Sequence, residues 1–174
     1  MIELLIVIAI LAILAVTVIL VLNPVQILAQ SRDVQRMSDI ATVKSAVAAY
    51  LTTVSGPTLS AGPYSTADVT CGFGTCTVTT STAVSGSGWM AVDLTSTTGG
   101  SPIASLPIDP TNSAIYQYAY KGDDTNKTFE LNARLESTKY RTQMGTDGGD
   151  DSSCSTYTES TCYYEIGTDP GLDL

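Results

Sequence analysis

The apolar positions of this chain change their pattern within the first third of the sequence. Residues 4–22 are all apolar except Thr17, and this run approaches the length of about 20 residues that a membrane-spanning helix needs. Further along, apolar residues recur every three or four positions, which predicts an amphipathic helix lying on an apolar surface. These residues are Val34, Met37, Ile40, Val43, Val47, Tyr50 and Val54. The pattern predicts a helical stem that is apolar on all sides at first and on one side later.

A proline separates the two parts of this stem. Pro24 removes one helical N–H and places its ring against the carbonyl four residues earlier, so we expect a break or kink between Thr17 and Pro24. We assign residues 1–25 to the apolar helix and residues 26–54 to the amphipathic helix. The charged residues of the second helix are interpreted as its solvated face; they are Arg32, Asp33, Arg36, Asp39 and Lys44.

Residues 55–174 have the sequence character of a β-rich head domain. Ser, Thr, Gly and Pro replace the helical pattern, which is typical of loops and short strands. The strongest strand signal is the alternation of apolar and polar residues at 115–120 and 128–135, on both sides of the hairpin sequence KGDDTN. Shorter strands are expected at 69–70, 77–80, 90–94 and 163–166, and Trp89 is expected to fill the core.

The predicted fold class is α+β. The long helical stem is expected to pack on a small antiparallel sheet, and an extended C-terminal loop tied by a disulfide is expected to follow. The four cysteines are Cys71, Cys76, Cys154 and Cys162. An even number of cysteines in a small acidic chain with an apolar N-terminus favours an oxidising, extracytoplasmic setting.

Four cysteines allow three disulfide connectivities. We favour Cys71 with Cys76 and Cys154 with Cys162, because each pair brackets a turn-like segment and short loops close easily. The alternative is a zinc site with four thiolates, whose paired ligands are usually separated by about two to four residues. Here four and seven residues separate the members of the two pairs, which favours disulfides.

The charge of the chain argues against several classes of function. The formal net charge is -9, with eight Lys and Arg and no His. Phosphate binding requires a concentrated basic face, so we expect no nucleic-acid partner. The absence of histidine removes the commonest general base and the commonest metal ligand. We therefore do not expect an enzyme.

A C-terminal acidic segment, TDGGDD, is the one candidate for metal binding. Its carboxylates Asp147, Asp150 and Asp151 could offer oxygen ligands to calcium, but the segment lacks the spacing and the bidentate Glu of a helix–loop–helix calcium site. We interpret it as a solvated acidic turn and expect no cofactor, with calcium as the weak alternative.

A carboxylate at the start of the apolar run requires an explanation. A charge placed in hydrocarbon costs about 2.5–3.5 kcal/mol on insertion scales, so Glu3 is expected to have a partner. The alternative is that Glu3 sits at the membrane boundary, where a carboxylate near a helix N-terminus is favourable by a fraction of a kcal/mol.

The stretch IELLIVIAILAILA, residues 2–15, resembles the N-terminal motif of type IV pilins and of the pseudopilins of type II secretion systems. In that family a prepilin peptidase removes a short leader, and an acidic residue neutralises the N-terminal amine of the adjacent subunit in the filament core. Glu3 matches this residue, although the family has it fifth in the mature chain. The family's proline at the end of the apolar run has no counterpart at Leu20. LPIDPTN and the hairpin after it are loosely similar to the heads of the same group.

The resemblance implies a homopolymer held together by its N-terminal helices. The residues of the filament core would then be Leu4, Leu5, Ile6, Val7, Ile8, Ile10, Leu11, Ile13 and Leu14. Before assembly the subunit would lie in the cytoplasmic membrane with its head outward, and afterwards in an extracellular pilus that serves adhesion, motility or DNA uptake. The alternatives are a periplasmic pseudopilin and, from another class, a membrane-anchored binding module that does not polymerise.

Overall fold

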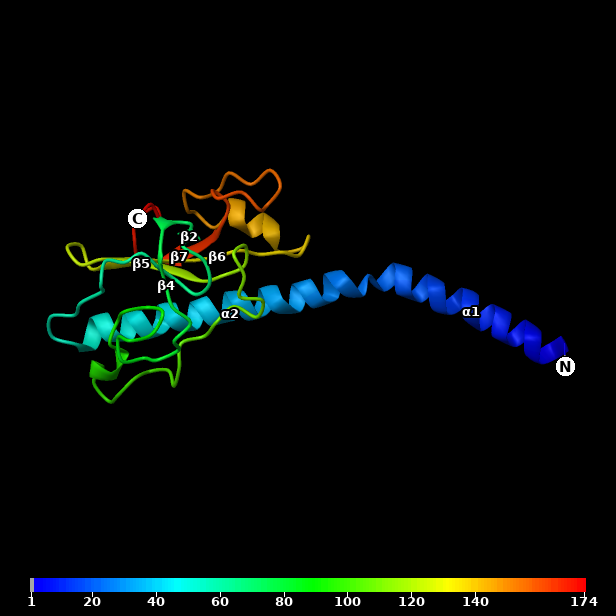
Figure 1. The fold of residues 1–174 in the computed structure, drawn as a ribbon, viewed down its shortest axis with the longest axis horizontal. Coiled ribbons are helices and arrows are strands. Elements are labelled where there is room, and N and C mark those ends of the chain that lie inside the picture. The colour runs from blue at the N-terminus through cyan, green and yellow to red at the C-terminus, as the bar shows by residue number, and fades with distance from the viewer. Residues whose placement is uncertain (1) are drawn as a thin grey trace.

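The computed structural model describes residues 2–174, except for the side chain of Leu20. It consists of a long helical stem with a head packed around its C-terminal half (Figure 1). The stem has two helices, α1 (Ile2–Leu22) and α2 (Pro24–Thr53). Two short 3-10 helices lie in the head, η1 (Leu94–Ser96) and η2 (Arg141–Gly145). The α+β class is as predicted.

The stem is interrupted at a single residue between its two helices. Asn23 has φ 41° and ψ 72°, in the left-handed region, which asparagine tolerates better than most residues. Its side-chain oxygen accepts a hydrogen bond of 3.4 Å from the N–H of Gln26 and so caps α2. Pro24 is the first residue of α2, where a missing N–H costs nothing. The break lies within the expected interval, and Pro24 starts a helix there.

The head contains a five-stranded sheet in the order β4-β1-β5-β6-β7 and a separate hairpin of β2 and β3. The strands of the larger sheet are β1 (Tyr64–Ser65), β4 (Thr77–Val78), β5 (Ala119–Asp123), β6 (Thr128–Ala133) and β7 (Tyr164–Gly167); those of the hairpin are β2 (Thr70–Cys71) and β3 (Gly74–Thr75). The sheet is mixed, because β1 and β4 pair in parallel while the other pairs are antiparallel. The expectation of a purely antiparallel sheet is therefore wrong at this edge, where the β2–β3 hairpin returns the chain for a parallel pairing.

Two of the expected strands also differ from the structure. β5 begins at Ala119 instead of 115 and continues through Asp123, and the side chain of Asp123 then accepts the N–H groups of Thr125 and Asn126 to close the turn. The strand expected at 90–94 does not form. Asp93 there accepts a 3.0 Å hydrogen bond from the N–H of Thr95, and this cap starts η1 in place of a strand.

The sheet is covered on both faces, as Figure 1 shows. α2 covers one face with Ile40, Val43, Val47 and Tyr50, which belong to the same buried cluster as Tyr118, Tyr120, Phe129 and Leu131 of the sheet region. Trp89 is fully buried in this cluster, as predicted, and its indole N–H donates to the carbonyl of Pro107 at 2.8 Å. The long loop between β4 and β5 thereby joins the core.

Two disulfides tie the loops of the head. Cys71 pairs with Cys76 and Cys154 with Cys162, which is the connectivity that the spacing favours. The first packs against Ala119 of β5. The second closes the C-terminal loop and packs with Leu135 and Met144. The disulfides compensate for the small hydrophobic contribution that these Ser- and Gly-rich segments can make.

We expect Ile40→Ala to destabilise the head by about 2–5 kcal/mol, because it leaves a cavity between α2 and the sheet. Ile40 is 0% exposed, whereas Val34 on the same helix is 49% exposed. Val34→Ala is the matched control and should change stability by no more than about 0.5 kcal/mol. Denaturant unfolding of the full chain in detergent, followed by the fluorescence of Trp89, measures both. Equal effects of the two substitutions would contradict the assigned core.

Candidate functional site: an exposed apolar helix anchored to the head

α1 exposes apolar side chains on every side and has no packing partner within the described residues. Its large apolar side chains are between 51% and 81% exposed. At 1.5 Å per residue its 21 residues span about 31 Å, close to the hydrocarbon thickness of a bilayer. The most apolar 18-residue window of the stem has a mean hydropathy of 3.5, and none of it is buried. By length and composition this helix can cross a membrane.

Glu3 is the only charged residue of α1 and lies in its first turn. Within residues 2–174 no Lys or Arg side chain forms an ion pair with it. The apolar residues assigned to a filament core follow it directly on α1 and are all exposed. The structure therefore leaves both the carboxylate and the apolar surface free for contacts outside this chain.

The connection between stem and head is a buried ion-pair network centred on Arg36 of α2. The Nε and Nη2 atoms of Arg36 donate to the two carboxylate oxygens of Asp109 at 2.7 and 3.1 Å. Its Nη1 donates to Asp33 at 2.9 Å, and Nη2 also donates to the hydroxyl of Thr111. The ring of Tyr116 lies 4.6 Å from the guanidinium carbon. Arginine suits this position because its planar fork pairs with carboxylates in a bidentate manner.

Asp33 extends the network to the end of β6. Its two carboxylate oxygens accept the backbone N–H groups of Glu136 and Ser137 at 2.9 and 2.8 Å. The carboxylate of Glu136 in turn pairs with Arg32 on the next face of α2. One turn of the helix is thus bonded to two segments of the head that lie far apart in the sequence, the loop at Asp109 and the loop after β6 at Glu136.

The network places one buried cation between two buried carboxylates. Arg36 and Asp33 are 0% exposed and Asp109 is 3% exposed. Burial by itself lowers the pKa of Arg36, but the hydrogen bond and the charge of Asp109, followed by the hydrogen bond of Asp33, raise this pKa by more. Arg36 therefore stays charged. Removing one of its carboxylate partners would leave a buried charge without compensation, which is strongly destabilising.

The interpretation of the charged helix face as solvated is therefore wrong for Asp33 and Arg36. The prediction that Val34 belongs to the buried apolar face of the second helix is also wrong, because Val34 is exposed. The i, i+3 spacing of an acidic and a basic residue gives the same sequence signal on a surface as in a buried network. The isolated Asp109 in the proline-rich stretch LPIDPTN was the available clue, because it is the buried counter-charge.

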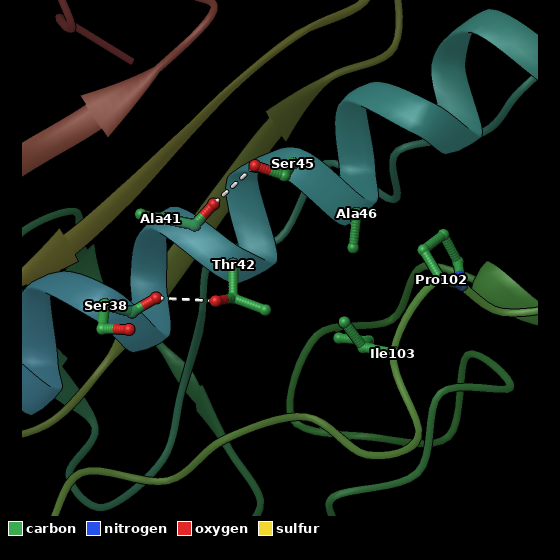
Figure 2. A pocket seen from close by; sticks show the side chains of 7 residues that line it. All are labelled: Ser38, Ala41, Thr42, Ser45, Ala46, Pro102 and Ile103. Atoms are coloured by element: carbon green, nitrogen blue, oxygen red, sulfur yellow. Dashed lines mark hydrogen bonds between the residues drawn. The ribbon is translucent and has the colours of Figure 1, made fainter.

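A shallow groove of about 400 Å³ runs along α2 beside the head, shown in Figure 2. It is lined by Ser38, Ala41, Thr42, Ser45 and Ala46 of the helix and by Pro102 and Ile103. The hydroxyls of Thr42 and Ser45 donate to carbonyls of their own helix at 2.8 and 2.9 Å. The groove is therefore lined by small residues of α2 together with Pro102 and Ile103, and its lining contains no acidic or basic side chain.

The acidic C-terminal segment does not form a metal centre. Across residues 2–174 there is no group of three or more His, Cys, Asp or Glu arranged to hold a metal ion. Asp147 accepts the backbone N–H of Glu165 at 2.9 Å and that of Gly149 at 3.3 Å. Burial raises the pKa of Asp147, and burial together with the charge of Asp150 raises the pKa of Asp151 to about 6. The turn is partly buried, so the expectation of a solvated acidic turn is only partly right.

No protein-family model, no curated protein and no solved structure matches this chain. The functional interpretation therefore depends on the exposed helix, its carboxylate and its anchoring to the head.

We expect Asp109→Ala to destabilise the head by about 3–5 kcal/mol, because it leaves Arg36 buried without its main counter-charge. Replacing Arg36 by Met in the same chain should recover part of this loss, because the unpaired guanidinium is then absent and Asp33 keeps its hydrogen bonds from the N–H groups of Glu136 and Ser137. The exposed pair Lys127 with Asp124 provides the control, and Lys127→Met should cost no more than about 1 kcal/mol. Chemical denaturation of the full chain in detergent measures all three variants. An Asp109→Ala effect as small as that of Lys127→Met would contradict the anchoring role.

Proposed function

We propose that this protein is the major structural subunit of a type IV pilus, polymerised through α1. The observation that carries this proposal is the state of α1: an entirely exposed apolar helix, with one carboxylate in its first turn, joined to a head through α2. A helix of this kind requires a surrounding that is itself apolar, either lipid or other copies of the same helix.

The exchange of lipid for neighbouring subunits is physically feasible for this helix. Lipid tails are as apolar as the side chains of α1, so leaving the membrane for a filament core changes the hydrophobic free energy little. Packing and charge pairing must then select the register between subunits. A Glu3 carboxylate facing the terminal amine of a neighbour suits this purpose, because every wrong register leaves a charge unpaired in an apolar core. Repeating one such heterologous contact produces an open fibre.

The rest of the molecule supports the same proposal. The Arg36 network fixes the head to α2 without a flexible linker, so a repeated contact between helices also repeats the positions of the heads. The two disulfides suit a head outside the cytoplasm. The net charge of -9 gives a polymer with an acidic, soluble outer surface.

The proposal also specifies location and partners. The subunit would first lie in the cytoplasmic membrane with its head outward, then be processed by a prepilin peptidase and assembled by the pilus machinery into a homopolymer. Adhesion, motility and DNA uptake are the candidate roles of the fibre. DNA uptake would require other components to bind the nucleic acid, because this chain has only eight Lys and Arg.

We expect Glu3→Gln to reduce the yield of fibres sheared from the source cells at least tenfold while the subunit stays in the membrane fraction. The substitution keeps the size of the side chain and removes the charge that selects the register. Glu3→Asp, which keeps the charge, is the matched control and should retain more fibre than Glu3→Gln. Electron microscopy and N-terminal sequencing of the fibre subunit provide the measurement.

Two results would reject parts of the proposal separately. Fibres of the Glu3→Gln chain at the original yield would reject the register role of the carboxylate. If no fibre from cells with the original sequence contains this chain, and the detergent-extracted protein is a monomer, the polymer itself is rejected. Short fibres confined to the periplasm would assign the chain to a secretion pseudopilus.

A further inference from the structure

The outer face of the sheet buries two carboxyl groups next to each other. Phe129 and Leu131 of β6 point to the α2 side, so Glu130 and Asn132 point to the opposite side. Asn132 is directly opposite Glu165 of β7, and Glu130 is opposite Gly167. Glu130 and Glu165 are therefore diagonal neighbours across the strand pair, within reach of each other. Each is 1% exposed.

The C-terminal part of the chain closes over these carboxyl groups. The N–H of Asp151 donates to Oε2 of Glu165 at 3.1 Å, and the N–H of Leu174 donates to Oε2 of Glu130 at 3.2 Å. Gly149 also lies against Glu165, where a Cβ would collide with the Glu165 carboxylate. We call residues 147–151 together with Leu174 the cover. Figure 1 shows the C-terminal segment on the side of the sheet opposite α2.

No cation neutralises the two carboxyl groups within residues 2–174. Lys121 of β5 is directly opposite Glu130, yet the two form no ion pair, and its Nζ lies 5.9 Å from the ring centroid of Phe73. Arg134 directly follows β6. Its guanidinium donates to the carbonyls of Ile115, Glu159 and Cys162 and forms no ion pair with either glutamate.

The remaining titratable groups near the pair add negative charge. They are Asp147, Asp150 and Asp151 of the cover region, of which Asp150 raises the pKa of Glu130 and the other two that of Glu165. Among these acidic groups, Arg134 lowers the pKa of Asp151. Two buried glutamates cannot both ionise at low cost in such surroundings.

A proton retained by the pair resolves this conflict. Oε1 of Glu165 is buried without a hydrogen-bond partner, as are both amide atoms of Asn132. A protonated Glu165 can donate to Glu130. Burial first, and then this hydrogen bond and the neighbouring negative charge, raise the pKa of Glu165; burial is also the main cause of the raised pKa of Glu130. The pair titrates as a unit, with both pKa values raised above the ordinary glutamate range.

We propose that a proton shared between Glu130 and Glu165 holds the cover onto the outer face of the sheet, and that the cover is released at alkaline pH. This is a conformational device of the head and goes beyond the proposed assembly through α1. The closed form binds the proton more tightly than the open form, in which both glutamates meet water and have their ordinary pKa near 4.3.

The sign of the pH dependence follows from this difference in proton binding. At pH values below the ordinary glutamate pKa, the opening constant of the cover is lowest and does not change with pH. Between that pKa and the raised values, closing takes up as many as two protons. The opening constant therefore rises with pH by up to about a hundredfold per unit while both protons are retained, and by up to about tenfold per unit while one is. Above the raised values both forms are ionised and the opening constant no longer changes.

Amide hydrogen exchange of the full chain in detergent micelles tests the proposal. After correction for the intrinsic exchange rate, the protection factor of the Asp151 N–H should fall at least tenfold between pH 6 and pH 8. In Glu165→Gln, which keeps the shape of the side chain, the fall should be smaller than in the original chain, because only Glu130 still titrates. Glu130→Gln is the second variant, should Glu165→Gln fail to fold. Asp124→Asn is the control, because Asp124 lies in the β5–β6 turn and its pKa is lowered; this variant should keep the fall of the original chain.

Three outcomes would overturn the proposal that a shared proton holds the cover closed. The first is a protection factor that stays constant between pH 6 and pH 8. The second is an equal fall in the original chain and in both glutamine variants. The third is a protection at pH 6 that disappears on adding a chelator, since a divalent cation would then hold the carboxylates together in place of the proton. Carbon-13 titration of the Glu130 and Glu165 carboxyl groups in the unmodified chain must also show at least one raised pKa.

Discussion

The molecule depends on a helix that its own chain does not bury. α1 leaves large apolar side chains exposed along its whole length, and each such side chain would gain about 1.5–3 kcal/mol from full burial. This helix therefore needs lipid or other helices around it. The head has a hydrophobic core formed by α2, the sheet and the loop with Trp89, and α1 contributes no residue to it. α1 and the head therefore require different surroundings: an apolar one for α1 and water for the surface of the head.

The Arg36 network fixes α2, the helix that follows α1, to the rest of the head. A packed apolar face alone would allow α2 to slide or rotate on the sheet at modest cost, because apolar contacts have little directionality. The bidentate contact with Asp109 and the backbone contacts of Asp33 fix one position and one rotation of the helix. Buried ion pairs rarely add much net stability, but breaking one is expensive. We infer that the network serves mainly to fix the position of α2 on the sheet and adds less to the free energy of unfolding.

The two faces of the sheet are covered in different ways. α2 covers one face with apolar side chains, while the other carries Glu130, Asn132 and Glu165 beneath segments rich in Gly, Ser and Asp. Arg134 binds the disulfide loop through the carbonyls of Glu159 and Cys162. The cover is therefore held by polar contacts to carboxyl groups that titrate. The helix side has a hydrophobic core without such groups.

Several features could be predicted from the sequence because their physical causes are local. The apolar run, the position of Glu3 and the helix break near Pro24 depend on residues that are adjacent in the chain. The same holds for the alternating pattern of β6 and the short spacing of Cys71 with Cys76. Other features were decided by tertiary structure. Asp33 and Arg36 have the helical spacing of a solvated pair and are buried only because Asp109 and the end of β6 arrive from elsewhere. The pairing of Glu130 with Glu165 and the parallel edge of the sheet likewise depend on the register between distant strands. A local pattern reports which residues can share a face, and only the folded chain determines what that face meets.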